Sequence, residues 1–210
     1  MTLRISHRVE QTHALGPGQR AALWVHGCCF QCPGCLAQRY KEGPYTEQTP
    51  EALAQWYLSI PDSDGLTISG GEPMLQAGPL ARMVAAIRRQ RDTGIIVYTG
   101  FVYENLVEKA ATDPQLASFL QSIDLLIDGP FLQEKNDGKA LRGSSNQRAI
   151  PLTDRYRGAV DRYGADIGRQ IEISITDTGT VMVGVPDEDQ LKIWQKIKAI
   201  GEKEHGAIDE

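Results

Sequence analysis

“ALWVHGCCFQCPGC”, residues 22–35, places an apolar segment directly before all four cysteines of the chain. Cys28, Cys32 and Cys35 follow the spacing C-x3-C-x2-C, and Cys29 lies next to the first of them. A short apolar run that ends at a polar segment is typical of a buried strand followed by a loop. Thiolates are ligands of zinc and of iron–sulfur clusters. The stretch therefore predicts a strand that leads into a metal-binding loop.

Two kinds of centre fit three or four thiolates at this spacing. A structural zinc site is closed by four ligands, which would require Cys29 or one of His26, His7 and His13. A [4Fe-4S] cluster held by only three thiolates leaves one iron open for an outside ligand. We expect the three spaced cysteines to be ligands of a cluster and Cys29 to be a bystander.

The composition is that of a soluble globular domain. The chain has 210 residues, of which 41% are hydrophobic and 23% charged, enough for one hydrophobic core without disulfides. Its net charge of −5 argues against a nucleic-acid partner, for which a basic surface is typical. We see no apolar run of about 18 residues and no signal-peptide core, so we expect no membrane contact and a cytoplasmic location. Thiols stay reduced in the cytoplasm, which favours metal binding over disulfides.

Short apolar runs alternate with segments of helical periodicity along the first 150 residues. This alternation predicts repeated βα units, an α/β barrel or partial barrel with its chemistry on the loops after the strands. The cysteine loop, “SGGEP” (69–73), “TG” (99–100) and “DGP” (128–130) are such loops. We expect strands at 23–25, 66–69, 95–99 and 125–128, and helices beginning at Pro50 and spanning 79–91, 104–110 and 114–122.

The composition of the chain changes near Pro151, where a polar, arginine-rich segment predicts a surface connection. Strands at 171–175 and 180–185 around “TDTG” predict a β-hairpin, and a helix is expected at 187–200. We therefore divide the chain into a core domain, 1–150, and a C-terminal extension, 151–210, packed on the core. We favour an extension that caps a sheet edge over one that redirects the protein to another target.

Two motifs together resemble the radical S-adenosylmethionine (SAM) enzymes. One is the cysteine spacing, and the other is Gly70-Gly71-Glu72, which follows the next apolar strand. The resemblance implies that backbone carbonyls of this Gly-Gly-Glu loop hold the SAM amino group. Consecutive glycines permit such a close approach. Glu72 would support that contact or the loop itself.

Further motifs resemble one family of radical SAM enzymes, the activating proteins of the anaerobic ribonucleotide reductase. They are “CPGC” (32–35), “IIVYTGF” (95–101), “DLLIDGPFLQEKND” (124–137) and “LRGSSNQR” (141–148). Most radical SAM enzymes have an aromatic residue before the third cysteine, whereas this chain has Gly34, as that family does. The resemblance runs from about Arg4 to Arg148.

The resemblance implies a fold, cofactors and a reaction. The fold would be a partial (β/α)6-type radical SAM barrel, followed here by the hairpin and helix. Cys28, Cys32 and Cys35 would hold a [4Fe-4S] cluster whose open iron binds SAM. An electron from a flavodoxin or ferredoxin would cleave SAM to a 5′-deoxyadenosyl radical. This radical would abstract a glycine α-hydrogen from a partner, the large subunit of an anaerobic ribonucleotide reductase or a similar glycyl-radical protein.

Four further residues are candidates for the SAM pocket. Asp128 ends an apolar strand, where its carboxylate would bind a ribose hydroxyl, a cation or the SAM amino group, or would only cap a helix or form the turn. Asn146 and Arg148 offer an amide and a guanidinium to the SAM carboxylate or adenine. Thr99 follows its own strand in the same way.

Two other functions stay open at this point. The first is a radical SAM enzyme whose substrate is a small molecule or peptide, with the extension shaping the pocket. The second, from another class, is a zinc-stabilised interaction module without catalytic activity. No cysteine follows Cys35, so auxiliary clusters are not expected in either.

Overall fold

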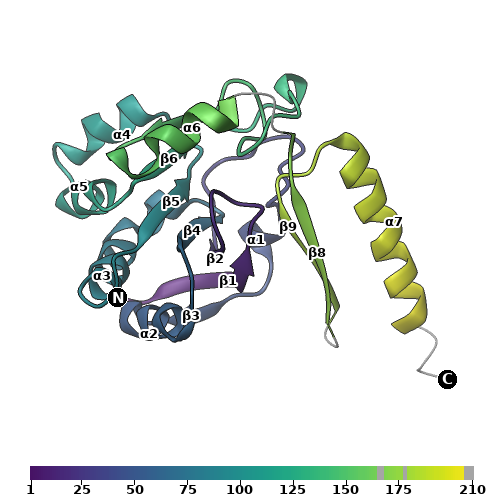
Figure 1. Ribbon diagram of the computed structural model, residues 1–210, viewed down its shortest axis with the longest axis horizontal. Coiled ribbons are helices and arrows are strands. Elements are labelled where there is room, and N and C mark those ends of the chain that lie inside the picture. Colours follow the sequence, from purple (N-terminus) through teal and green to yellow (C-terminus); the bar gives the residue numbers. More distant parts are fainter. Residues whose placement is uncertain (165–167, 177–178, 206–210) are drawn as a thin grey trace.

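The computed structural model describes residues 1–164, 168–176 and 179–205. Its centre is a seven-stranded mixed sheet of order β3-β1-β2-β4-β5-β6-β7 (Figure 1). The α/β class expected from the sequence is therefore confirmed. The strands of this sheet are β1 Leu3–Thr12, β2 Arg20–Val25, β3 Thr46–Gln48, β4 Gly65–Gly70, β5 Gly94–Tyr98, β6 Leu125–Asp128 and β7 Arg148–Pro151.

Four parallel strands, β2, β4, β5 and β6, form the middle of the sheet. They contain the four apolar runs expected as strands, and nearly every residue in them is buried. Strands covered on both faces read as continuous apolar runs, which explains why they were found from the sequence. Because these strands are parallel, their carboxyl ends meet at one edge of the sheet, and there Val25 pairs with Gly70.

One face of the sheet is covered by helices that pack side by side. The helix α3 buries Leu80, Met83, Val84 and Ile87 completely, as its periodicity predicts. Helix starts follow the sequence signals: Thr49 and Asp113 cap backbone N–H groups, each before a proline. The helices of this layer are α2 Pro50–Ser59, α3 Ala77–Arg88, α4 Tyr103–Ala110 and α5 Pro114–Gln121, and the 3₁₀ helix η1 Pro73–Gln76 precedes α3.

The strands β1, β3 and β7 are antiparallel to their neighbours. None of them was expected from the sequence, and they make the sheet mixed where a wholly parallel one was predicted. The strand β1 alternates between buried and exposed residues and carries two irregularities in its pairing with β2. The short β7 ends in Pro151 at the edge of the sheet, a position that tolerates proline.

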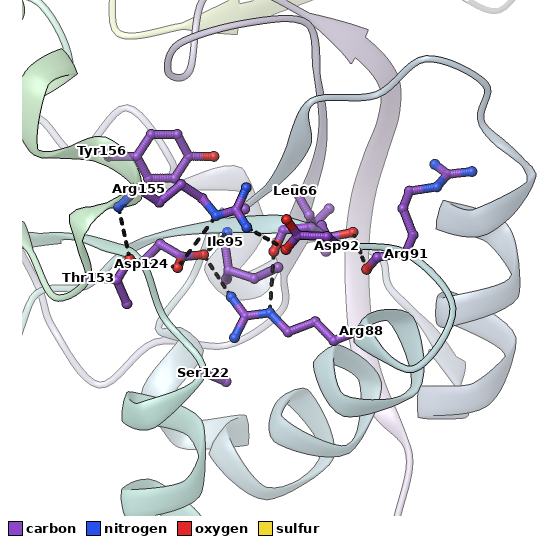
Figure 2. A network of polar contacts seen from close by, with 12 residues as sticks. Leu66, Arg88, Arg91, Asp92, Ile95, Ser122, Asp124, Thr153, Arg155 and Tyr156 are labelled. Atoms are coloured by element: carbon purple, nitrogen blue, oxygen red, sulfur yellow. Dashed lines mark hydrogen bonds and ion pairs between the residues drawn. The ribbon is translucent and has the colours of Figure 1, made fainter.

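The amino ends of the parallel strands are joined by polar contacts. Fully buried Arg20 donates to the Thr67 hydroxyl, the Tyr156 hydroxyl and the carbonyl oxygens of Pro17, Leu66 and Gly94. Near it, Asp124 accepts hydrogen bonds from Arg88, the Ile95 N–H and the Thr153 hydroxyl, at 2.7, 2.7 and 2.8 Å (Figure 2). These contacts fix the end of the sheet that lies away from the cysteine loop.

The C-terminal extension covers part of the other face of the sheet. Val183 packs in one cluster with Leu15, Ala22, Trp24 and Tyr40. Within the described residues the hairpin is a separate two-stranded sheet that pairs with no strand of the main sheet, and the expectation that the extension covers a sheet edge stays a prediction. The expected hairpin and final helix are present, as β8 Ile171–Thr176, β9 Gly179–Gly184 and α7 Glu188–His205, whereas the hairpin positions 177–178 lie outside the described residues.

The segment expected as a surface connection contains helical structure. It forms the 3₁₀ helix η3 Asp154–Tyr156 and then α6 Arg157–Gly164. Tyr156 is buried against the sheet in a cluster with Ile96, Leu125, Ile127 and Leu141, which explains why this polar stretch is ordered on the core. The other short helices are α1 Arg39–Glu42, after the cysteine loop, and the 3₁₀ helix η2 Gln133–Lys135.

Candidate active site at the carboxyl ends of the parallel strands

The loops that follow the four parallel strands surround one cavity of about 150 Å³. Its wall includes Cys28, Cys32 and Cys35 from the loop after β2, and Cys29 is exposed and is not among the described residues that line it. The remaining strand ends and loops contribute Gly70 at the end of β4, Gly71 and Glu72 after it, Thr99 and Gly100 after β5, and Gly129 and Phe131 after β6. The cavity therefore gathers the expected cysteines and the Gly-Gly-Glu loop.

Backbone hydrogen bonds shape the cysteine loop. The Gly27 N–H donates to the Tyr40 carbonyl at 3.0 Å, and the Cys35 N–H donates to the Cys32 carbonyl at 3.2 Å. The Phe30 N–H donates to the Cys28 Sγ at 3.4 Å. Burial raises the pKa of the Cys28 thiol, and the Phe30 N–H partly opposes this rise. Metal binding would reverse the effect, because a coordinating thiol is deprotonated by the metal.

The two glycines of the Gly-Gly-Glu loop allow it to lie directly on the cysteine loop. The Gly71 N–H donates to the Val25 carbonyl, and the Glu72 N–H donates to the Gly27 carbonyl, both at 2.8 Å. A Cβ atom on Gly71 would lie 2.0 Å from the Gly27 oxygen, and Gly70 has φ +111°. Both positions therefore require glycine in order to join the two loops.

Glu72 joins the loop after β4 to the loop after β5. Its Oε1 accepts hydrogen bonds from the Met74 N–H at 2.9 Å and the Thr99 hydroxyl at 2.8 Å. Its Oε2 accepts from the Gly100 N–H at 2.8 Å. Burial raises the pKa of Glu72 to about 7, against the lowering effect of these hydrogen bonds. The contacts of Glu72 in the structure are with the loops themselves, and its support of a SAM contact stays a prediction.

Asp128 and Arg148 bind each other beside the cavity. Arg148 Nε donates to Asp128 Oδ1 at 3.1 Å, and its two terminal nitrogens also donate to Glu104. Asp128 Oδ2 further accepts from the Tyr103 N–H at 2.8 Å. Neither residue is among the described residues that line the cavity. Their expected contact with SAM stays a prediction.

Asn146 lies on the loop between η2 and β7. Its Nδ2 donates to the Pro130 carbonyl at 2.8 Å, and its Oδ1 is buried with no hydrogen-bond partner among the described residues. Its neighbour Gln147 lines the cavity, donates to the Gly129 carbonyl and accepts from the Gly143 N–H. Sequence reasoning named Asn146 and passed over Gln147, although both belong to the motif “GSSNQR”.

Several lining residues were missed from the sequence. Phe30, Tyr98 and Phe131 belong to the segments that carry the motifs, and Lys41 lies in α1, which follows the cysteine loop. Their local signals were too weak to separate them from their neighbours. Lys41 lowers the pKa of the Cys28 thiol slightly through its charge, a smaller effect than burial. Val185, from the extension, also lines the cavity. Nothing in its own sequence indicates this, because the contact depends on how the hairpin packs.

The thiols are not arranged as ligands of a single ion. Within residues 1–164, 168–176 and 179–205, no three cysteine, histidine or carboxylate side chains converge as a ready site for one metal ion. An iron–sulfur cube is a larger body, and its cysteine ligands are distributed around it. Three thiols that line one cavity are the ligand set expected for a cluster with one open iron.

The sequence matches the family model described as “4Fe-4S single cluster domain” over residues 14–150. This range contains the cysteine loop, the Gly-Gly-Glu loop and every lining residue of the cavity except Val185. Membership in a 4Fe-4S family supports an iron–sulfur cluster as the cofactor. It also weakens the zinc-module alternative.

Eight curated relatives share one name, anaerobic ribonucleoside-triphosphate reductase-activating protein. The protein from Vibrio cholerae is 34% identical over 146 residues, covering 63% of this chain and 87% of the relative. That from Haemophilus influenzae is 35% identical over 143 residues, with the same two shares. The protein of enterobacteria phage T4 is 30% identical over 146 residues, covering 66% of this chain and 88% of the relative. The chain belongs to this family of activating proteins.

Membership in the activating-protein family confirms the resemblance found in the sequence. The matches account for about two thirds of this chain, and the family model ends at residue 150, just before the extension begins. The extension, like residues 1–13, lies outside the range that the family model matches. Among the described residues, no helix is long and apolar enough to cross a membrane.

Proposed function

We propose that this chain is a radical SAM enzyme that installs a glycyl radical in an anaerobic ribonucleotide reductase. The observation that carries the proposal is the single cavity shared by Cys28, Cys32, Cys35 and the Gly-Gly-Glu loop. When bound, a [4Fe-4S] cluster and SAM would supply one-electron cleavage of the SAM carbon–sulfur bond, giving methionine and a 5′-deoxyadenosyl radical that takes the glycine α-hydrogen. The names of the relatives support the choice of partner.

In this proposal the three thiolates hold the cluster, and the backbone of Gly70 and Gly71 holds the SAM amino group. Glu72 keeps that backbone in place, since its carboxylate is already occupied by Met74, Thr99 and Gly100. Lys41 provides a cation at the cavity wall, suited to a carboxylate. In this proposal Gly70 and Gly71 allow SAM to approach the backbone closely, and Glu72 and Lys41 orient it.

Asp128, Asn146 and Arg148 border the same site from the loops around β6 and β7. Asn146 donates to the Pro130 carbonyl, and Arg148 donates to Asp128. These hydrogen bonds fix the loop on which Gly129 and Phe131 line the cavity. We propose that they position this wall for SAM. Direct contact with SAM would require Arg148 to exchange part of its pairing with Asp128 and Glu104.

The proposed architecture is a partial (β/α)6-type radical SAM barrel built by residues 1–150, with residues 151–210 as an extension packed on it. The open side of a partial barrel would admit a segment of the partner. Reduced flavodoxin or ferredoxin would supply the electron. We propose a cytoplasmic location, where such reductants and the reductase occur together.

The test is made with anaerobically reconstituted protein, SAM, a chemical or flavodoxin reductant and an anaerobic ribonucleotide reductase. We expect 5′-deoxyadenosine to form and an electron paramagnetic resonance signal of a glycyl radical to appear on the reductase. 5′-Deoxyadenosine without any radical on the reductase would leave the SAM chemistry intact but overturn the partner, and would favour a small-molecule or peptide substrate. The absence of both products would overturn the proposal.

A further inference from the structure

A second cavity, of about 270 Å³, lies next to the first and is built jointly by the core and the extension. The two cavities share five lining residues, Leu36, Ala37, Ser69, Tyr98 and Val185, so they adjoin each other. We call the second cavity the side chamber. Because it adjoins the cavity proposed for the cluster and SAM, a group bound in it lies next to the place where a hydrogen atom would be taken.

Four of the twelve described residues that line the side chamber are aromatic. Trp24 and Tyr98 come from the sheet, Tyr40 from α1, and Trp194 from α7. Aromatic rings provide large, rigid contact areas and are enriched where proteins bind peptides and other proteins. Two of these four rings belong to elements outside the central sheet, so the chamber depends on how α1 and α7 pack.

The extension contributes backbone as well as side chains. Met182 and Gly184 of β9 line the side chamber, and since Gly184 has no side chain, the main chain of β9 forms part of the wall. The strand β9 pairs with β8 along one edge, and no described strand pairs with its other edge. An antiparallel strand with one free edge presents unpaired N–H and C=O groups. An extended peptide is the ligand that pairs with such an edge.

The extension is anchored so that this wall is fixed. Arg169, which is buried, donates to the Pro186 carbonyl directly after β9 and to the Gly143 carbonyl on the loop that lines the cluster cavity, both at 2.8 Å. Glu172 of β8 accepts a hydrogen bond from the His13 N–H at 2.8 Å. The hairpin is therefore tied to the core at two places.

Arg39 supplies a positive charge at the wall of the side chamber. Its guanidinium lies 4.7 Å from the centre of the Tyr40 ring and donates to the Tyr40 hydroxyl. Among the described residues, no carboxylate forms an ion pair with Arg39. A guanidinium beside an aromatic wall binds a carboxylate readily. The chamber thus suits an extended segment that carries an acidic residue.

We infer that the side chamber is the binding site for an extended, acidic segment of the protein partner, which pairs with β9 and presents the hydrogen-donor glycine to the adjoining cavity. The inference rests on the proposed function. It gives the extension a role in binding the partner, whereas the sequence favoured a cap on a sheet edge over redirection to another target.

The experiment compares chamber variants with matched controls in the full-length, reconstituted protein. Trp194→Ala removes a chamber ring, and Ile193→Ala, its exposed neighbour on α7, is the control. Met182→Trp fills the chamber, and Ser174→Trp adds the same ring at an exposed position of β8. Arg39→Glu reverses the charge of Arg39. The readouts are binding of the reductase and the ratio of glycyl radical to 5′-deoxyadenosine formed.

We expect the chamber variants to weaken reductase binding and to lower the radical-to-5′-deoxyadenosine ratio at least tenfold, with the two controls close to wild type. Chamber variants that match their controls in both readouts would overturn this inference alone, provided that the wild type binds the reductase and transfers the radical. A wild-type protein that cleaves SAM but neither binds the reductase nor transfers a radical to it would overturn the proposed partner, and this inference with it.

Discussion

The Thr99 hydroxyl donates a hydrogen bond to the carboxylate of Glu72 at 2.8 Å, across the gap between the loops after β5 and β4. Glu72 is fully buried. The bond therefore joins two of the four loops around the cluster cavity through a group that is costly to ionise in this place. The backbone N–H of the same residue donates to the Gly27 carbonyl of the cysteine loop, so Glu72 connects three loops and the geometry of the site depends on it.

The first prediction concerns the pH dependence of stability. The pKa of Glu72 is raised to about 7 in the folded chain, from an ordinary value of 4.5, chiefly by burial. The folded state thus holds this proton more tightly, and the associated stability is fully present below pH 4.5 and is lost as the pH rises through about 7. Glu72→Gln, which has no proton to lose there, removes this dependence.

The free energy of unfolding of cluster-free protein, measured with urea at pH 4.5 and pH 8, tests this. We expect wild type to lose on the order of 3 kcal/mol more than Glu72→Gln over this range, because each pKa unit corresponds to about 1.4 kcal/mol. Equal losses in the two proteins would show that Glu72 titrates normally.

The second prediction assigns the cluster ligands. Cys28→Ala, Cys32→Ala and Cys35→Ala should each lose the iron–sulfur absorption and most of the bound iron and sulfide, since a cluster with three protein ligands tolerates the loss of none. Cys29→Ala is the matched control, because Cys29 is exposed and is not among the residues that line the cavity. The assignment fails if Cys29→Ala loses the cluster while one of the other variants keeps it.

The third prediction concerns the contact between the two loops. Gly71→Ala would place a Cβ 2.0 Å from the Gly27 oxygen, so one of the loops has to move. We expect a loss of about 1–3 kcal/mol in stability and much weaker SAM binding by the reconstituted protein. Calorimetry gives both quantities.

Gly158→Ala is the control for this variant. Gly158 lies in α6 with open space around its Cα, and alanine in a helix is favoured over glycine by about 0.5–1 kcal/mol. The two substitutions should therefore change stability in opposite directions. A Gly71→Ala protein as stable as Gly158→Ala, with unchanged SAM binding, would contradict the loop contact.

The fourth prediction concerns Arg20 at the opposite end of the sheet. Its side chain is fully buried, and all its described hydrogen bonds are to neutral acceptors on β4, β5 and the segments around Pro17 and Tyr156. Arg20→Met leaves several buried acceptors unsatisfied. We expect a loss of about 3–5 kcal/mol, seen as a lower urea midpoint, whereas Arg157→Met at an exposed position should change it little. A small effect of Arg20→Met would mean that water replaces the guanidinium.

The middle of the sheet could be predicted from the sequence, and its edges could not. The strands β5 and β6 contain the apolar runs “IIV” and “LLI”, which are buried on both faces, a pattern visible without any knowledge of the fold. The strand β1 reads “LRISHRVEQT”, and β7 reads “RAIP”. The strands β1 and β7 form because they pair with β2 and β6, and both pairings are antiparallel. The local sequence does not show these pairings.

The site was predictable to the same extent. The cysteines, Gly70, Gly71, Glu72 and Thr99 meet because each follows a parallel strand, a rule that needs only the order of the elements. Asp128 also follows such a strand, but Arg148, twenty residues later, pairs with it, and this pairing depends on the antiparallel β7. The sequence could not predict that Val185 and Trp194 line the cavities, since their positions follow from the packing of the hairpin on the face of the sheet.

The central claim, that three thiolates hold a cluster that cleaves SAM, is tested most directly by the amount of 5′-deoxyadenosine formed from SAM by reduced, anaerobically reconstituted protein. We predict formation by wild type and by Cys29→Ala, and none by Cys32→Ala. A wild-type protein that retains four iron and four sulfide ions per chain, in keeping with a [4Fe-4S] cluster, and yet forms no 5′-deoxyadenosine would contradict the account.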